Sequence, residues 1–312
     1  MYPIYIFAYI LSISMKVYDC FMFSDEKMIL DIRLNVLNEY VDHFIIVESK
    51  YKHNGDIKNK NFDINNYSKF KNKITYIYLD KEPSGLVNTE AIIDEDKKNR
   101  KLLHNTYIRE NHQRDMIYKG LSESEKNDFI IIGDVDEIPN LKNFDFEKTK
   151  NEIIIFKQKM FYYKLNLFYK ELEWTGSRAC RKKLLRSPQW LRNVKDKKYP
   201  FWRPDIFFSK TKYKDIHFIT NGGWHFSYMK TARDIEKKLK SYLHHREYDL
   251  DPIGEEKINK MINNKKPVYD LKTDMKNSKF KGGQELVVSR TDELPNYIKK
   301  NLNKYKQWLI EV

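Results

Sequence analysis

The sequence predicts an α/β fold in which a mostly parallel sheet is flanked by helices. Its first part alternates strand, helix and strand, the pattern of two parallel strands joined by a crossover helix. Further along, the apolar run Phe129–Ile132 contains three β-branched residues and reads as a strand that is buried on both faces. Together these two observations indicate one sheet with helices packed on its faces.

The first strand is expected at Lys16–Phe23. Ser24 is a candidate N-cap for the helix that follows, and the two acids after it suit the first turn, where the helix dipole favours negative charge. Apolar residues then recur at helical spacing: Ile29, Ile32, Val36, Leu37 and Tyr40. Phe44–Val47 is a second buried strand. Glu48 follows it directly, so it is expected at the carboxyl end of a parallel strand.

A third strand and a helix lead to the next candidate residues. Lys73–Leu79 alternates as a strand, residues 81–100 read as a loop and the start of a charged helix, and Asn105–Gly120 is predicted to be helical, closed by its glycine. Arg114 lies on this helix, and arginine suits two-pronged recognition of phosphate. The alternative is an arginine that is simply solvated.

Length and composition point to a globular enzyme. A chain of 312 residues with 41% hydrophobic and 14% aromatic residues can bury a sizeable core. We expect an apolar N-terminal segment at 1–15, the main domain at 16–250, and a Lys/Asn-rich extension packed on that domain at 251–312. Two cysteines, Cys20 and Cys180, are too few for a disulfide scaffold or a cysteine zinc site.

The net charge of +14 favours an anionic partner, such as a nucleotide sugar, a nucleic acid or an acidic membrane face. The alternative is a general excess of lysine spread over solvated surfaces. The uncharged segment 1–15 is a candidate anchor or leader. As a helix its apolar part spans roughly 21 Å, less than the roughly 30 Å of a hydrocarbon core. The sequence thus leaves a cytoplasmic and a membrane-associated location open.

Three carboxylates come directly after the buried strand, in Asp134-Val135-Asp136-Glu137. Ligands of open α/β sheets bind at the carboxyl ends of strands. In an extended Asp-Val-Asp the two aspartates project to one side and the valine points away. Two hard oxygen ligands can hold magnesium or manganese and leave positions for a diphosphate. A solvated acidic turn is the alternative interpretation.

A region rich in tryptophan and basic residues follows. Four of the five tryptophans lie between 174 and 224, and nearly all charged residues between 178 and 198 are basic. Aromatic faces stack nucleobases and sugar rings alike. The alternative is a basic surface over an aromatic core.

The second informative stretch is Asn221–Ser227, which reads NGGWHFS. Its two glycines allow close approach of the backbone to a ligand. His225 is a candidate imidazole ligand of a divalent metal whose other ligands are Asp134 and Asp136, although a lone histidine is more often structural. Thr231-x-x-Asp234 then resembles a capping box at the start of a helix.

At this point the chain resembles a known family. The segments VYDCFMFSDEKMILDIRLNVLNEYVDHFIIVES, ENHQRD, DVDEIP and GGWHFS, in this order, resemble glycosyltransferase family 17. The resemblance implies a GT-A fold, a UDP-GlcNAc donor, a divalent metal, and inversion at the anomeric carbon. It also implies a glycan or glycoprotein acceptor, with a β-mannose hydroxyl as a candidate, rather than a nucleic acid. Membrane association would run through residues 1–15.

Carried over residue by residue, Asp134 and Asp136 match the acids that hold metal and diphosphate. Glu48 and Arg114 fall on matching positions and are expected to contact the donor, and His225 is expected at the metal. An inverting transfer also needs a carboxylate that takes the proton of the acceptor hydroxyl. Glu137 and Asp205 are the two candidates. The alternatives are another nucleotide-sugar donor, a metal-dependent nuclease or phosphotransferase, and a basic binding module without catalysis.

Overall fold

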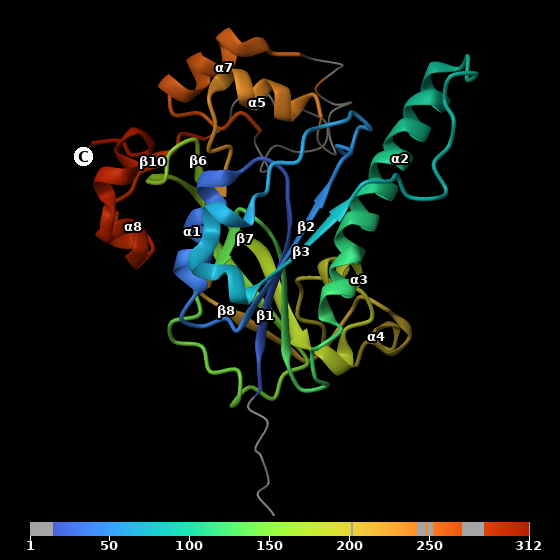
Figure 1. Ribbon diagram of the computed structural model, residues 1–312, viewed down its shortest axis with the longest axis vertical. Helices are drawn as coiled ribbons and strands as arrows, with labels where there is room; N and C mark the ends of the chain where they lie inside the picture. The colour runs from blue at the N-terminus through green and yellow to red at the C-terminus, as the bar shows by residue number, and fades with distance from the viewer. Residues whose placement is uncertain (1–14, 201, 242–247, 249–251, 270–283, 312) are drawn as a thin grey trace, which may run out of the picture.

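The computed structural model describes residues 15–200, 202–241, 248, 252–269 and 284–311. Figure 1 shows a central twisted sheet with helices on both sides. The apolar residues of the inner strands alternate between two cores, because successive side chains of a strand point to opposite faces. On β2, Phe44 and Ile46 belong to the core under α1, whereas Ile45 and Val47 belong to the core on the other face. The mixed α/β architecture predicted from the sequence is confirmed.

The described strands form one sheet in the order β3-β2-β1-β4-β7-β6-β9-β5, with β10 beside β7 and β8 beside β6. Their bounds are β1 Val17–Phe23, β2 His43–Ser49, β3 Ile74–Leu79, β4 Phe129–Asp134, β5 Glu137–Pro139, β6 Ile153–Tyr162, β7 Leu167–Arg181, β8 Ile216–Ile219, β9 Gly223–Ser227 and β10 Val287–Val288.

The sheet is mixed, with five parallel and four antiparallel pairs among the described strands, so the larger part of it is parallel, as predicted. Strands β3, β2, β1 and β4 are parallel to one another, as the alternating pattern indicated. Beyond them β7 runs antiparallel to β4 and to β6. Only residues 163–166 separate β6 from β7, a connection too short for the crossover that a parallel pair needs.

The helices cover both faces and one end of the sheet. Their bounds are α1 Lys27–Leu37, α2 Glu95–Asp115, α3 Pro188–Asn193, α4 Asp205–Phe208, α5 Ala232–Leu239, α7 Gly254–Asn263 and α8 Asn296–Lys300. Helix α1 packs against α8, α2 contacts α3, and α5 and α7 lie together at one end of the sheet (Figure 1). Short 3-10 segments connect them: η1 Ile64–Lys73, η2 Met116–Leu121, η3 Lys182–Leu184, η5 Thr291–Glu293 and η6 Leu302–Trp308.

One predicted helix cap was wrong, and α2 starts within the charged stretch where a helix start was expected. Ser24 does not cap α1, whose N-cap is Glu26; the Glu26 carboxylate instead accepts hydrogen bonds from the main-chain N–H groups of Ser24 and Asp25 at 3.2 and 3.0 Å. Helix α2 begins at Glu95, because the Asp94 carboxylate accepts from Lys97 N at 2.7 Å and caps a start that lacks an apolar pattern. The capping box at Thr231 is confirmed, with Thr231 Oγ1 accepting from Asp234 N at 3.3 Å.

Several described residues near the C-terminal end pack against β1 and α1. Leu294, Ile298 and Tyr305 are buried in the same core as β1 and α1. The Tyr305 hydroxyl donates to the Asp31 carboxylate on α1 at 2.9 Å. Within the described ranges no helix is both long and apolar enough to cross a membrane. The candidate anchor at 1–15 lies almost wholly outside these ranges.

Candidate active site

The acidic stretch lies at the carboxyl edge of the parallel strands, as predicted. Strand β4 ends at Asp134, and β5 starts at Glu137 and pairs antiparallel with β9. Val135 and Asp136 form a turn rather than the extended Asp-Val-Asp that was expected, and Val135 is 5% exposed in the core beside α1. Gly133 is required by packing, since a Cβ atom there would lie 2.6 Å from Ser177 Oγ. Ser177 on β7 therefore packs closely against the end of β4, directly before the turn.

A buried arginine fixes the main chain of this turn. Arg33 of α1 is 0% exposed and donates through Nη1 to Asp134 O and Glu137 O, both at 2.7 Å. Its Nε and Nη2 atoms donate to the two carboxylate oxygens of Asp19 on β1, each at 2.7 Å. A two-pronged ion pair of this kind restricts the guanidinium to one orientation. The turn is thus anchored to both the first strand and the first helix.

Asp134 carries its carboxylate between two arginines. Its Oδ1 atom accepts from Arg114 Nη2 at 3.1 Å, and its Oδ2 atom accepts from Arg192 Nη2 at 3.2 Å. Burial raises the pKa of Asp134, but Arg192 and Arg114 outweigh it and hold the pKa well below its usual range. The predicted donor-binding residues Arg114 and Asp134 are therefore direct neighbours.

Glu137 is enclosed by donors. It is 1% exposed, and its Oε2 atom accepts from Asp134 N at 2.9 Å and from Arg192 Nη1 at 2.8 Å. Its Oε1 atom accepts from Trp174 Nε1 at 2.7 Å. These contacts make Glu137 the brace of the turn and the anchor of Arg192. Its role as general base stays a prediction.

Asp136 faces a different set of neighbours. Its Oδ1 atom lies 3.7 Å from His225 Nε2, and its Oδ2 atom lies 4.0 Å from Lys238 Nζ on α5. Burial raises the pKa of Asp136, and His225 and Lys238 lower it to below the usual value. His225 packs against Trp174, with 4.9 Å between the ring centroids and 34° between the ring planes, and its buried Nδ1 atom has no hydrogen-bond partner among the described residues.

The oxygens at this turn fit a divalent cation whose remaining ligands come from a substrate. Magnesium is bound in such sites by one or two carboxylates together with substrate phosphates, and Asp134 and Asp136 supply two. Among the residues that the structure describes, no group of three or more His, Cys, Asp and Glu side chains is placed to hold a metal ion. His225, beside Asp136, is the nearest nitrogen candidate.

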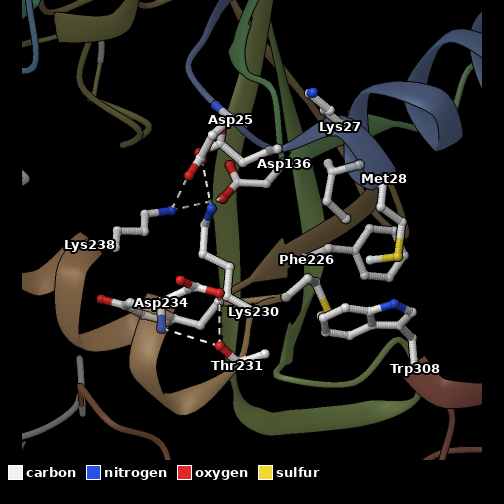
Figure 2. A pocket seen from close by; sticks show the side chains of 14 residues that line it. Asp25, Lys27, Met28, Asp136, Phe226, Lys230, Thr231, Asp234, Lys238 and Trp308 are labelled. Carbon is white, nitrogen blue, oxygen red and sulfur yellow. Dashed lines mark hydrogen bonds and ion pairs between the residues drawn. The ribbon is translucent and has the colours of Figure 1, made fainter. Parts of the chain in front are cut away.

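A cavity of about 230 Å³ opens beside Asp136 (Figure 2). The N-terminal end of α1, the turn between β9 and α5, and η6 enclose it. Met28, Phe226 and Trp308 line one side, and Asp25, Lys230 and Lys238 line the other. The acidic turn therefore borders a space large enough for part of a small ligand.

A protein-family model matches residues 9–310, nearly the whole chain, and it describes glycosyltransferase family 17. The chain belongs to glycosyltransferase family 17. A comparison with curated proteins finds none that matches this chain. A member of this family is a transferase whose partners are a nucleotide sugar and a glycan acceptor.

Two residues of this family 17 member that were predicted to belong to the site, Glu48 and Asp205, have no described contact with the acidic turn. Glu48 is 0% exposed, and its carboxylate accepts from Asn61 N at 2.8 Å, from Phe62 N at 3.0 Å and from the Tyr76 hydroxyl at 2.9 Å, besides pairing with Lys58. It anchors the loop that follows β2. Its contact with the donor stays a prediction.

Asp205 lies in a surface cluster of ions. Its carboxylate binds Arg203 at 2.7 and 2.8 Å and Lys212 at 2.5 Å, and these hydrogen bonds lower its pKa to about 2. All three residues belong to one short segment, and none of their described contacts reaches the acidic turn. Its role as base also stays a prediction, although so low a pKa makes a weak base.

Sequence reasoning missed three cations of the site. Arg192 was grouped with a basic surface, yet its side chain is 14% exposed and points inward to Glu137. Arg33 and Lys238 were seen only as members of amphipathic helices. A signal for Arg33 exists, because Asp19 in an otherwise apolar strand calls for a buried cation. Lys238 and Arg192 carry no such local signal.

His53 is a further missed neighbour. Its Nε2 atom lies 3.3 Å from Gln113 Oε1, beside the carboxylate of Glu110 and the guanidinium of Arg114. Burial lowers the pKa of His53, which favours its neutral form. The loop after β2 thus brings a neutral imidazole to the Arg114 side of the site.

Proposed function

We propose that this chain is an inverting, metal-dependent glycosyltransferase that moves N-acetylglucosamine from UDP-GlcNAc to a glycan hydroxyl, with a β-mannose of a glycoprotein glycan as the candidate acceptor. The observation that carries the proposal is the turn Asp134–Asp136 at the carboxyl edge of the sheet, whose main chain is fixed by Arg33 and whose Asp134 carboxylate lies between Arg114 and Arg192. Rigid placement of charged groups is what electrostatic stabilisation of a leaving group needs.

In this proposal the diphosphate of the donor binds on the Asp134 side of the turn. Arg114 and Arg192 already lie there, with side chains 4% and 14% exposed, and arginine binds phosphate oxygens through paired N–H groups. When the donor binds, these arginines can turn part of their hydrogen bonds from Asp134 to the phosphates. Charge that develops on the departing UDP is then met by cations already in position.

Asp134 and Asp136 would hold the divalent metal, manganese or magnesium, and His225 is the candidate third ligand. When bound, the metal neutralises negative charge on the leaving diphosphate. The Arg33 clamp supports this role, because it fixes the main chain that carries both aspartates. Residues that orient ligands in this way matter nearly as much as the ligands themselves.

The general base has to face the acceptor. Glu137 is enclosed and Asp205 is ion-paired at the surface, so we extend the candidates to the carboxylates that line the cavity. Glu26 accepts two main-chain N–H groups and Asp234 belongs to the capping box, whereas the Asp25 carboxylate pairs, among the described residues, only with Lys230, at 2.6 Å. Asp25 is therefore the cavity carboxylate with the fewest internal partners, and we propose it as the base.

In the proposed transfer, the Asp25 carboxylate takes the proton of the acceptor hydroxyl. The hydroxyl oxygen forms a bond to the anomeric carbon of the donor sugar, and the bond from that carbon to the phosphate oxygen breaks on the opposite face. The electron pair leaves with UDP. A positioned base of this kind contributes about 10²–10⁴-fold to the rate.

A donor panel tests the proposal. UDP release from UDP-GlcNAc, UDP-Gal and UDP-Glc is measured with manganese and with excess chelator, together with donor binding by calorimetry. The expected result is manganese-dependent release and binding that favour UDP-GlcNAc. Preference for UDP-Gal or UDP-Glc would keep the transferase and change the donor. Absence of binding by every nucleotide sugar would contradict the proposal.

A further inference from the structure

The cavity described above has two unlike walls. Met28, Phe226 and Trp308 form an apolar wall, and Asp25 and Lys230 lie on the opposite, polar wall (Figure 2). A sugar ring has the same two characters, since its C–H face packs on aromatic side chains and its hydroxyl groups exchange hydrogen bonds with polar residues. The two walls are therefore complementary to one sugar ring.

The charges in the cavity nearly cancel. It is lined by four acids and three lysines: Asp25, Glu26, Asp136 and Asp234, and Lys27, Lys230 and Lys238. Lys230 pairs with Asp25 at 2.6 Å, and Lys238 lies 3.9 Å from Glu26 and 4.0 Å from Asp136. A phosphate here would meet carboxylates that are already present, at a cost in repulsion. The cavity suits a neutral ligand with many hydroxyl groups.

The volume of the cavity and its opening to solvent favour one sugar ring of a longer glycan as the ligand. The cavity of about 230 Å³ has the volume of about eight water molecules at about 30 Å³ each, which is of the order of a single sugar ring. The side chain of Asp25 is 56% exposed, so the polar rim opens to solvent. A glycan can place one residue inside while its remaining residues stay outside.

The position relative to the two aspartates separates acceptor from donor. Arg114 and Arg192, which suit the diphosphate, flank Asp134, whereas the cavity borders Asp136. A sugar in the cavity thus lies on the side of the turn that is away from these two arginines. This is where the attacking hydroxyl of an acceptor has to come from.

Trp308 is held firmly enough to act as a platform. Its main-chain oxygen accepts from Leu165 N at 2.8 Å, and its indole packs against the core beside α1. A rigid aromatic side chain loses little entropy when a ligand stacks on it. No other described tryptophan lines this cavity.

We propose that the cavity is the acceptor subsite, in which a neutral sugar ring of the glycan stacks on Trp308 and bonds to Lys230 and Asp25. This inference rests on the proposed glycosyl transfer and adds the place where the acceptor binds. Trp308 and Lys230 are specificity residues in it, because they contact the acceptor sugar and not the diphosphate.

Binding of a simple probe tests the inference without any turnover. Saturation-transfer NMR with methyl β-D-mannopyranoside, and with the methyl β-glycosides of glucose and galactose, is recorded on the wild type and on Trp308→Ala, Trp308→Phe and Lys230→Ala. Trp202→Ala, which removes a 69% exposed tryptophan elsewhere, is the matched control. Thermal melting checks that each variant is folded, and calorimetry with UDP-GlcNAc measures donor affinity.

The expected result is that Trp308→Ala weakens glycoside binding at least tenfold, Lys230→Ala weakens it several-fold, and Trp308→Phe retains most of it. Trp202→Ala should change nothing, and donor affinity should move less than twofold in Trp308→Ala. Equal weakening of donor and glycoside would assign the cavity to the donor sugar and overturn the inference. So would a wild type that binds no glycoside, or a folded Trp308→Ala that binds as well as the wild type. A wild type that does not bind UDP-GlcNAc would instead count against the proposed transfer. Glycoside binding is a separate measurement and tests the acceptor subsite.

Discussion

Arg33 donates to the main-chain oxygen of Glu137 at 2.7 Å across 104 positions of the chain. Because the same guanidinium also binds Asp134 O, one side chain of α1 holds both ends of the turn that carries the candidate metal ligands. Asp19 on β1 holds the other edge of that guanidinium. Arg33 thus connects β1 and α1 to the turn. The positions of the candidate metal ligands therefore depend on how β1 and α1 pack in the core.

Arg33→Met should destabilise the fold. Removal of one partner of a buried ion pair leaves Asp19 charged and unpaired at 0% exposure, a loss of about 3–5 kcal/mol in the free energy of unfolding. Urea unfolding followed by circular dichroism measures it. The control Arg290→Met removes an exposed pair with Asp292 and should cost less than about 0.5 kcal/mol. Equal losses in the two variants would show that the Arg33 pair does not stabilise the fold.

Glu137→Gln should reduce stability and donor binding because Glu137 positions Arg192, and not because the variant loses a proton-accepting group. The amide keeps a hydrogen bond to Trp174 but leaves Arg192 without its buried carboxylate, so unfolding becomes easier by about 3 kcal/mol and donor binding weakens. The pH dependence of kcat/KM separates the two roles, because only loss of the base removes the acid limb of that profile. An unchanged donor affinity together with a lost acid limb would make Glu137 the base.

Asp25→Asn should lower kcat by about 10²–10⁴-fold with donor affinity retained, as expected for loss of the base. Asp205→Asn is its matched comparison, since that carboxylate is bound by Arg203 and Lys212 and its pKa is lowered to about 2. We expect Asp205→Asn to keep most of the transfer rate. The reverse pattern of rates would return the base to Asp205.

The Cys180 thiol should make the free energy of unfolding fall as the pH becomes alkaline. Burial raises the pKa of its thiol to about 12 in the folded protein, from about 9 when unfolded. Its contribution is therefore fully present below pH 9 and is lost as the pH rises through about 12. In urea unfolding between pH 8 and 11, Cys180→Ala should lose less stability per pH unit than the wild type. Parallel pH curves would show that the thiol does not stay neutral.

Local patterns predicted the parts of the molecule that depend on neighbours in sequence. The apolar run before Asp134 located the buried strand and placed the acids at its carboxyl end, but Val135 and Asp136 form a turn and do not continue the expected extended strand. The start of α2 at Glu95 falls within the charged stretch where a helix start was expected, although this helix has almost no apolar stripe and depends on the Asp94 cap. The long antiparallel pair of β6 and β7 was missed, since pairing direction follows from the connection between strands.

The partners of the site depend on long-range packing, and this is why they could not be read from the sequence. Arg192 meets Glu137 and Arg114 meets Asp134 only after the sheet and α3 have assembled. Glu137 shows the limit most clearly. Its place beside the aspartates suggested a catalytic acid, but the fold surrounds it with Trp174 and Arg192.

The most direct test of the central claim is the turnover of Asp136→Ala. UDP release from UDP-GlcNAc with manganese is compared with that of the wild type, and circular dichroism and thermal melting verify the fold. Because Asp136 is expected to hold the metal beside the diphosphate, the variant should remain folded and lose transfer, by at least about 10³-fold on the scale of electrostatic groups in active sites. Near-normal turnover in a folded Asp136→Ala would contradict the assignment of this turn as the metal and diphosphate site.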